Sequence, residues 1–180
     1  MRSSARPQAD AAKWAFVVLL LLAGPPALAA EALNAKAIAA DIAAHGADTV
    51  VAKLAADGDY DRVLDHIDKG ESEWVALAPR LAPGTDAGYA EELTISLAFA
   101  LPRNPKAVLA LLIAKDGFPA EDVCGAPFIE DTVKDVPAYV RRARAAVEKV
   151  NNPKLAVAKA ACLAALSKAA KAAPAMPEQE

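Results

Sequence analysis

Apolar residues recur every three or four positions through most of the chain after residue 30, which is the spacing of one face of an α-helix. The pattern predicts helices over 31–45, 48–57, 59–69 and 72–79, separated by breaks that contain glycine or proline. No run alternates β-branched and polar residues for long enough to indicate a sheet. The sequence therefore predicts an all-α fold.

The segment 89–115 is apolar nearly all round. Its second helix begins at Asn104-Pro105, where asparagine suits the cap position and proline suits the first helical turn. Asn152-Pro153 repeats this start and opens the last helix. Helices without a broad polar face belong in the middle of a fold, so we expect the hairpin 89–115 at the core.

The repeated helix starts indicate antiparallel helix pairs. We expect a compact bundle or short α-solenoid of stacked antiparallel helix hairpins, which forms a single helical domain over residues 30–173. Residues 116–131 contain several glycines and prolines and form the longest irregular stretch, before helix returns by Pro137. We expect residues 174–180 to form a disordered tail.

Residues 1–29 have the pattern of a secretory signal peptide. A basic start precedes a ten-residue apolar run over 14–23, and small residues at 27–29 suit cleavage before Ala30 or Glu31. The run is much shorter than the roughly 20 residues that span a bilayer, so we expect no stable membrane span after cleavage. The pattern predicts a periplasmic or secreted protein.

Cys124 and Cys162 are the only two cysteines of the chain. In an oxidising compartment an even number of cysteines favours disulfide formation. We therefore expect one disulfide that ties the irregular stretch 116–131 to the last helix. Cys162 shares an apolar helix face with Leu155 and Leu166, which suits a buried crosslink.

Charge is distributed unevenly along the chain. Acidic residues outnumber basic residues 18 to 8 over 31–131, whereas basic residues outnumber acidic ones 9 to 2 over 134–171. The basic segment, with Arg141, Arg142 and Arg144, either binds an anionic partner, packs against the acidic part or stays solvated. Aromatic residues make up only 5% of the chain, and export also argues against nucleic acid as a partner.

A second candidate contact surface follows Cys124. Phe128 and Ile129 lie in a segment that the disulfide would pin. A pinned loop loses less conformational entropy when it binds a partner. The segment therefore either presents Phe128 and Ile129 to a partner or folds them back over the core.

Five aspartates have the spacing of a calcium-binding loop. Arg62 stands where glycine would make the sharp turn, and Asp68 replaces the longer closing glutamate. The apolar pattern also favours a helix over 61–68, which would point the carboxylates apart, so we expect a solvated acidic helix face. The five residues are Asp57, Asp59, Asp61, Asp65 and Asp68.

Motifs for catalysis are weak. His45 and His66 are the only histidines, which is too few for a zinc site once the cysteines are paired. No serine lies in a Gly-x-Ser-x-Gly turn, and no glycine-rich phosphate loop is present. We therefore expect no catalytic residue, no metal site, no cofactor and no enzyme activity. Glu91, Glu92 and Asp131 leave a helical cell-wall glycan hydrolase as a less favoured alternative.

These features predict an exported helical protein-interaction or scaffold module that binds a protein partner in the cell envelope. The alternative is an envelope inhibitor or an immunity-type protein that neutralises an envelope-acting toxin. Both hypotheses use binding rather than catalysis.

Overall fold

A computed structural model describes residues 33–114, 117–129 and 132–172 of the chain. These ranges contain α-helices, two short 3-10 helices and no strand, which confirms the all-α prediction. The predicted signal peptide and the predicted tail lie outside the described residues.

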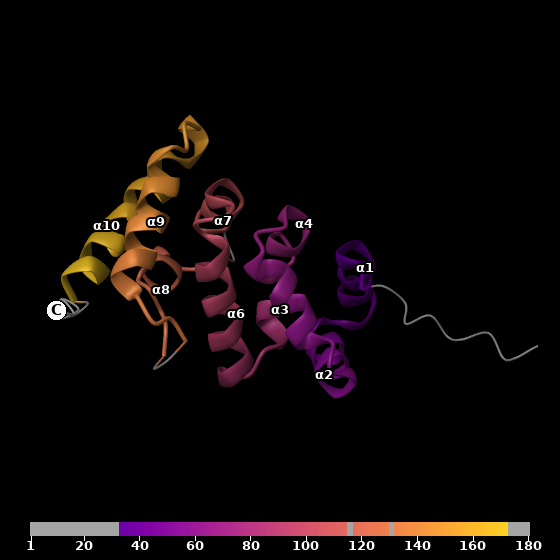
Figure 1. The fold of residues 1–180 in the computed structure, drawn as a ribbon. Helices are drawn as coiled ribbons and strands as arrows, with labels where there is room; N and C mark the ends of the chain where they lie inside the picture. Colours follow the sequence, from indigo (N-terminus) through magenta and orange to yellow (C-terminus); the bar gives the residue numbers. More distant parts are fainter. Residues whose placement is uncertain (1–32, 115–116, 130–131, 173–180) are drawn as a thin grey trace, which may run out of the picture. The chain divides into compact units, whose positions relative to one another are not determined.

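The helices pack as antiparallel hairpins in chain order, from α1 in indigo to α10 in yellow (Figure 1). This arrangement confirms the predicted stack of helix hairpins. In chain order the elements are α1 (Ala35–His45), α2 (Ala47–Asp57), α3 (Tyr60–Asp68), α4 (Ser72–Val75), α5 (Ala78–Leu81), η1 (Ala82–Gly84), α6 (Ala87–Ala100), α7 (Pro105–Leu111), α8 (Ala120–Cys124), α9 (Val136–Glu148), η2 (Pro153–Leu155) and α10 (Ala156–Ala172).

The hairpin α6–α7 lies in the middle of the stack, as the sequence predicts. Leu93, Leu97 and Leu101 on α6 and the following turn are fully buried. One tyrosine from α3 and one from α9 each donate a hydrogen bond to a backbone carbonyl of α6. The hydroxyl of Tyr60 on α3 donates a hydrogen bond to the carbonyl of Tyr89 over 3.0 Å.

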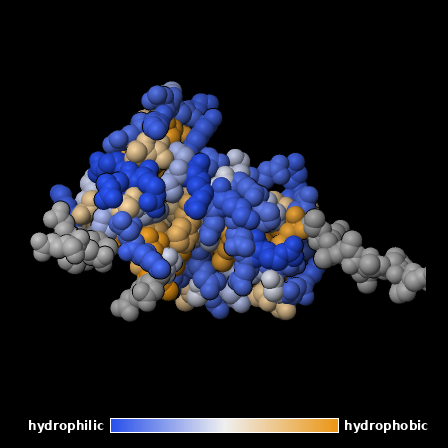
Figure 2. All heavy atoms as spheres, in the orientation of Figure 1, coloured by the Kyte–Doolittle hydropathy of each residue, from blue (hydrophilic) through white to orange (hydrophobic). Residues whose placement is uncertain are grey.

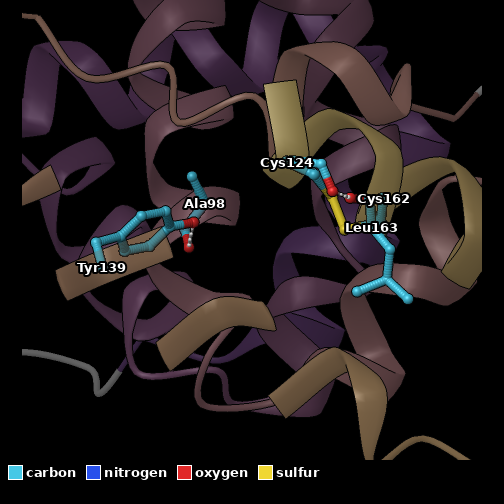
Figure 3. The surroundings of a disulfide bond; sticks show 6 residues. Ala98, Cys124, Tyr139, Cys162 and Leu163 are labelled. Carbon is cyan, nitrogen blue, oxygen red and sulfur yellow. Dashed lines mark hydrogen bonds between the residues drawn. A yellow bond between two sulfur atoms is a disulfide. The ribbon is translucent and has the colours of Figure 1, made fainter. Parts of the chain in front are cut away.

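Tyr139 on α9 anchors the other side of α6. Its hydroxyl donates to the carbonyl of Ala98 over 2.8 Å (Figure 3). A buried phenol needs such a partner, because an unpaired hydroxyl in the interior lowers stability. The core hairpin is therefore held from two sides by equivalent bonds.

Asn104 joins consecutive hairpins. Its side-chain oxygen accepts from the amide of Ala107 over 3.2 Å, which confirms the predicted helix start. Its side-chain amide donates to the carbonyl of Gly70 over 2.8 Å and to the hydroxyl of Ser72 over 3.0 Å. One asparagine thus starts α7 and also ties it to the turn between α3 and α4.

Gly70 makes that contact between hairpins feasible. Its φ is +73°, a left-handed conformation that side chains disfavour. An added Cβ would lie 3.0 Å from the Cβ of Asn104 and 3.1 Å from the Cβ of Arg103. Glycine therefore both turns the chain after α3 and allows the next hairpin to approach.

Two local predictions were wrong. The stretch 116–131 is not wholly irregular, because it contains the short helix α8. The expected helix over 72–79 is divided into α4 and α5, and Pro79 lies in the first turn of α5. Proline lacks an amide hydrogen and suits a first turn, so it begins a second helix here.

Cys124 and Cys162 form the predicted disulfide (Figure 3). Both residues are fully buried, and their Cα atoms are 5.3 Å apart. The bond joins the end of α8 to the middle of α10, so it connects two helices rather than a loop and a helix. Cys162 lies on the buried face of α10 with Leu166, as predicted.

Across the described ranges, no helix is both long enough and apolar enough to cross a bilayer.

Candidate functional site

One face of α6 and of the turn after it lines two neighbouring hollows on the surface. The residues that line them follow one another at steps of three and one positions, which keeps them on a single stripe of the helix. Phe99 borders both hollows. We call the two hollows together the α6 groove. Its stripe consists of Glu92, Ile95, Ser96, Phe99, Pro102 and Arg103.

The first hollow lies between α3 and α6 and has a volume of about 300 Å³. We call it the acidic hollow, because carboxylates stand around an apolar base. Leu64 and Ile95 supply apolar surface, and Thr132 closes one side. The carboxylates are Asp61, Asp65, Asp68 and Glu92.

Asp68 is the least solvated of these carboxylates. Its Oδ1 atom is buried and has no hydrogen-bond partner among the described residues. Burial raises the pKa of Asp68, whereas the hydroxyl of Ser96 and the charge of Arg103 act in the opposite direction. A cation placed in this hollow would therefore relieve a poorly solvated negative charge.

The second hollow lies between the end of α6 and α9 and has a volume of about 350 Å³. We call it the basic hollow. Arg103 and Arg142 line it from two different elements, and the guanidinium of Arg103 donates to the carbonyl of Phe99 over 2.6 Å. None of the ion pairs between described residues involves either arginine. Two exposed arginines thus border one apolar-walled space.

An aromatic cluster supports the basic hollow. The ring centroid of Phe128 lies 5.1 Å from that of Phe99 and 4.6 Å from that of Tyr139. The rings of Phe128 and Tyr139 meet edge to face, a geometry that stabilises aromatic pairs beyond simple burial. Of the two alternatives for this segment, Phe128 therefore folds back over the core, whereas Ile129 is 58% exposed.

The structure separates the three arginines that the sequence grouped. Arg142 reaches the basic hollow, and Arg141 is exposed without lining it. Arg144 is half-buried, donates to the hydroxyl of Ser167 and lies 3.7 Å from Glu148. Only one of the three therefore belongs to the α6 groove.

In the described ranges one ion pair joins the basic segment to the acidic segment, between Lys168 and Glu121 on α8. Helices α9 and α10 lie at one end of the row and α1 and α2 at the other (Figure 1). The described ion pairs of the basic segment join Arg144 to Glu148 and Lys168 to Glu121, and neither acid belongs to α1–α5. The basic segment therefore meets the acidic segment at α8 and makes no described ion pair with α1–α5.

The calcium-loop spacing does not form a calcium loop. Asp61, Asp65 and Asp68 lie within α3, as the apolar pattern predicts. Asp59 accepts from Arg62 over 2.6 Å rather than capping the helix. Within the described ranges no three histidine, cysteine or acidic side chains are grouped to hold a metal ion.

The remaining chemical candidates lie on helix surfaces. His66 stacks on Trp74 with ring centroids 4.3 Å apart, and His45 contacts Asp41 over 2.7 Å. Glu91, of the acid pair considered for glycan hydrolysis, is exposed and lines neither hollow. Asp131 lies outside the described residues.

Sequence reasoning missed Phe99, Arg103 and the acidic hollow as parts of one site. In the sequence both residues fall in the segment 89–115, whose apolar pattern predicts a core hairpin rather than a site. The helical stripe from Glu92 to Arg103 was the available signal, because it carries opposite charges at its two ends.

Comparison of the chain with protein-family models, with curated proteins and with solved structures finds no match, so the functional argument depends on the fold and on the α6 groove.

Proposed function

We propose that this chain is an exported protein-interaction module that binds an extended segment of a partner protein in the α6 groove. The observation that carries the proposal is the order of surfaces along α6. An acidic hollow, an apolar centre at Phe99 and a basic hollow follow one another on one helix face.

The dimensions of the groove suit a short peptide. Eleven positions separate Glu92 from Arg103 in the sequence, which corresponds to about 16 Å along a helix. An extended chain covers about 3.3 Å per residue, so roughly five residues match this length. Figure 2 shows apolar surface on both sides of α6, framed by hydrophilic residues. Such framing is typical of surfaces that bind other proteins.

The arrangement favours binding over catalysis. The acidic hollow has carboxylates on both walls, and the basic hollow is lined by two arginines and two aromatic residues. Opposite charges at the two ends would orient a partner and speed its association. The apolar centre would supply most of the contact area, because charges at a wet rim contribute little affinity.

Two further observations support the proposed compartment. The pattern of residues 1–29 predicts export, and the Cys124–Cys162 disulfide supports an oxidising environment such as the periplasm. A partner in the cell envelope is therefore part of the proposal.

Site-specific photo-crosslinking tests the proposal. A photoreactive amino acid replaces Ile95, which lines the acidic hollow, or Val157, which is 77% exposed on α10 and serves as the control position. After export in cells, we expect the Ile95 position to crosslink a defined set of envelope proteins that the Val157 position does not. Equal crosslinking at both positions would contradict groove binding.

A pair of neighbouring glutamates supplies the matched variants. Glu92→Lys places a positive charge in the acidic hollow, whereas Glu91→Lys makes the same change on an exposed position that lines neither hollow. We expect Glu92→Lys to abolish the crosslinks at Ile95 and Glu91→Lys to retain them.

The identity of the crosslinked proteins separates the two candidate functions. A single recurrent enzyme that loses activity when bound would assign the inhibitor alternative. Several structural partners would assign the scaffold.

A further inference from the structure

We infer that the basic hollow binds the C-terminal carboxylate of the partner segment, so that the α6 groove recognises a free chain end rather than an internal stretch. The inference rests on the proposed peptide-binding function and specifies its ligand.

The geometry of the basic hollow favours a carboxylate. Arg103 and Arg142 approach one space from the turn after α6 and from α9. Guanidinium groups bind carboxylates through two parallel hydrogen bonds, which makes arginine better suited than lysine to this task. The bond from Arg103 to the carbonyl of Phe99 restrains one guanidinium before any ligand arrives. A restrained donor loses less entropy on binding.

The electrostatics agree with this arrangement. Both arginines lie close enough to Tyr139 to act on its hydroxyl. Burial raises the pKa of Tyr139, and the charges of Arg103 and Arg142 act to lower it. The positive potential of both side chains therefore converges beside the aromatic wall.

The apolar walls indicate the end of a chain rather than an acidic side chain. Phe99, Pro102, Val133 and Tyr139 line the same space of about 350 Å³ as the two arginines. A C-terminal residue presents its carboxylate and its own side chain from the same Cα, so it can contact arginines and apolar walls together. Aspartate or glutamate carries its carboxylate at the tip of the side chain and would leave the walls unfilled.

The opposite charges of the two hollows set the direction of the peptide. With its carboxylate at Arg103, an extended peptide would reach Glu92 roughly five residues earlier in its own sequence. The acidic hollow would then contact a lysine or arginine at about that position. The inferred ligand is therefore a C-terminal segment with an apolar last residue and a basic residue about four or five positions before it.

Paired peptide libraries test the inference with the purified, disulfide-bonded protein. Both libraries contain random hexapeptides attached through their N-termini. One ends in the free acid and the other in the carboxamide, and a third arm adds a phosphoserine to the carboxamide library. We expect enrichment in the free-acid library, with an affinity advantage of about tenfold or more over the matched amides, measured by fluorescence anisotropy.

Arginine variants provide the matched controls. Arg103→Gln and Arg142→Gln each remove one guanidinium from the basic hollow, whereas Arg141→Gln removes an exposed charge from the same helix as Arg142. We expect the first two variants to lose the preference for free acid over amide, and Arg141→Gln to keep it. Circular dichroism confirms that each variant is folded before its affinity is compared.

The possible outcomes separate the inference from the proposed function. Equal binding of acids and amides, or a preference for the phosphoserine arm, would overturn the C-terminal carboxylate. Absence of hexapeptide binding while the Ile95 crosslinks persist would overturn the inference and leave the peptide-binding function in place. Absence of both hexapeptide binding and specific crosslinks would overturn both.

Discussion

The two sides of α6 are built differently. Helix α3 packs directly along α6 over most of its length, whereas α9 packs mainly on α10 and α7. The space between α6 and α9 is bridged instead by the side chains of Phe128 and Tyr139. The α3 side is therefore a helix-to-helix interface, and the α9 side is an interface of aromatic side chains.

This difference explains why the two hollows are unlike. Where α3 and α6 touch, the remaining cleft is bordered by the polar outer residues of both helices, and these are acidic. Where α9 stands away from α6, side chains form the walls and arginines from two elements can approach one space. The looser side is also held from behind by the Cys124–Cys162 disulfide, since α8 packs on α6 and is bonded to α10.

Among the changes that distinguish the two sides of α6, removal of the disulfide should reduce stability the most. The double variant Cys124→Ala with Cys162→Ala should reduce the free energy of unfolding by about 4 kcal/mol, because the crosslink closes a loop of 38 residues. Urea unfolding followed by circular dichroism measures the change. We expect the α9 side to open first, seen as faster hydrogen exchange in α8–α10 than in α3.

Reduction of the unchanged protein should produce the same loss, and the double variant should not respond to reductant. A melting temperature that is the same with and without reductant would contradict the structural role of the bond.

The second largest loss of stability should come from the two Asn-Pro helix starts, whose asparagines can be replaced as a matched pair. Asn104→Ala removes a helix cap and two bonds to the neighbouring hairpin, whereas Asn152→Ala removes only a cap on the amide of Lys154. We expect losses of about 2 kcal/mol for Asn104 and about 1 kcal/mol for Asn152 from urea unfolding. Equal losses would show that the bonds between hairpins do not contribute.

On the α3 side of α6, Asp68 should make the stability of the protein depend on pH. Burial raises the pKa of Asp68 in the folded protein above its unfolded value of 3.8. The folded state therefore binds this proton more tightly, so the associated stability is fully present below pH 3.8 and is lost as pH rises through the folded pKa.

Asp68→Asn removes this pH dependence. At pH 7 the variant should be more stable by up to about 1 kcal/mol, a value limited by the remaining contact of the carboxyl with water. Difference curves of the melting temperature between pH 3 and pH 8 measure the effect. A constant difference between variant and parent across this range would contradict it.

The two tyrosine anchors should show the smallest effect. Tyr60→Phe and Tyr139→Phe each remove one hydrogen bond to a carbonyl of α6. We expect each to reduce the free energy of unfolding by about 0.5–1 kcal/mol. If the α9 side depends more on single side chains than the α3 side does, Tyr139→Phe should give the larger loss. The opposite order in urea unfolding would contradict that comparison.

Much of the fold could be predicted from local sequence signals. Asn104 and Asn152 mark helix starts because their side chains can accept from nearby backbone amides. Cys162 was placed on a buried face because Leu166 lies four positions away on the same helix. Each of these features depends on residues a few positions apart, so the sequence contains all the information that they need.

The site was harder to predict, because its parts come from distant segments. The sequence placed Phe128 either over the core or toward a partner, and only the contacts with Phe99 and Tyr139 decide between them. Arg141 and Arg142 are adjacent in sequence, and the orientation of α9 brings only the second to the basic hollow.

The sequence by itself determined most of the helices, their order and the pairing of the two cysteines, because helical periodicity, capping and a single possible pair are local or combinatorial properties. Only the tertiary structure decided that Arg103 and Arg142 face one space and that the acidic side chains of α3 border the same stripe of α6. The physical reason is that a groove between helices depends on how far apart they pack. That distance is set by side chains such as those of Phe128 and Tyr139, and by the absence of a side chain at Gly70, where Asn104 approaches.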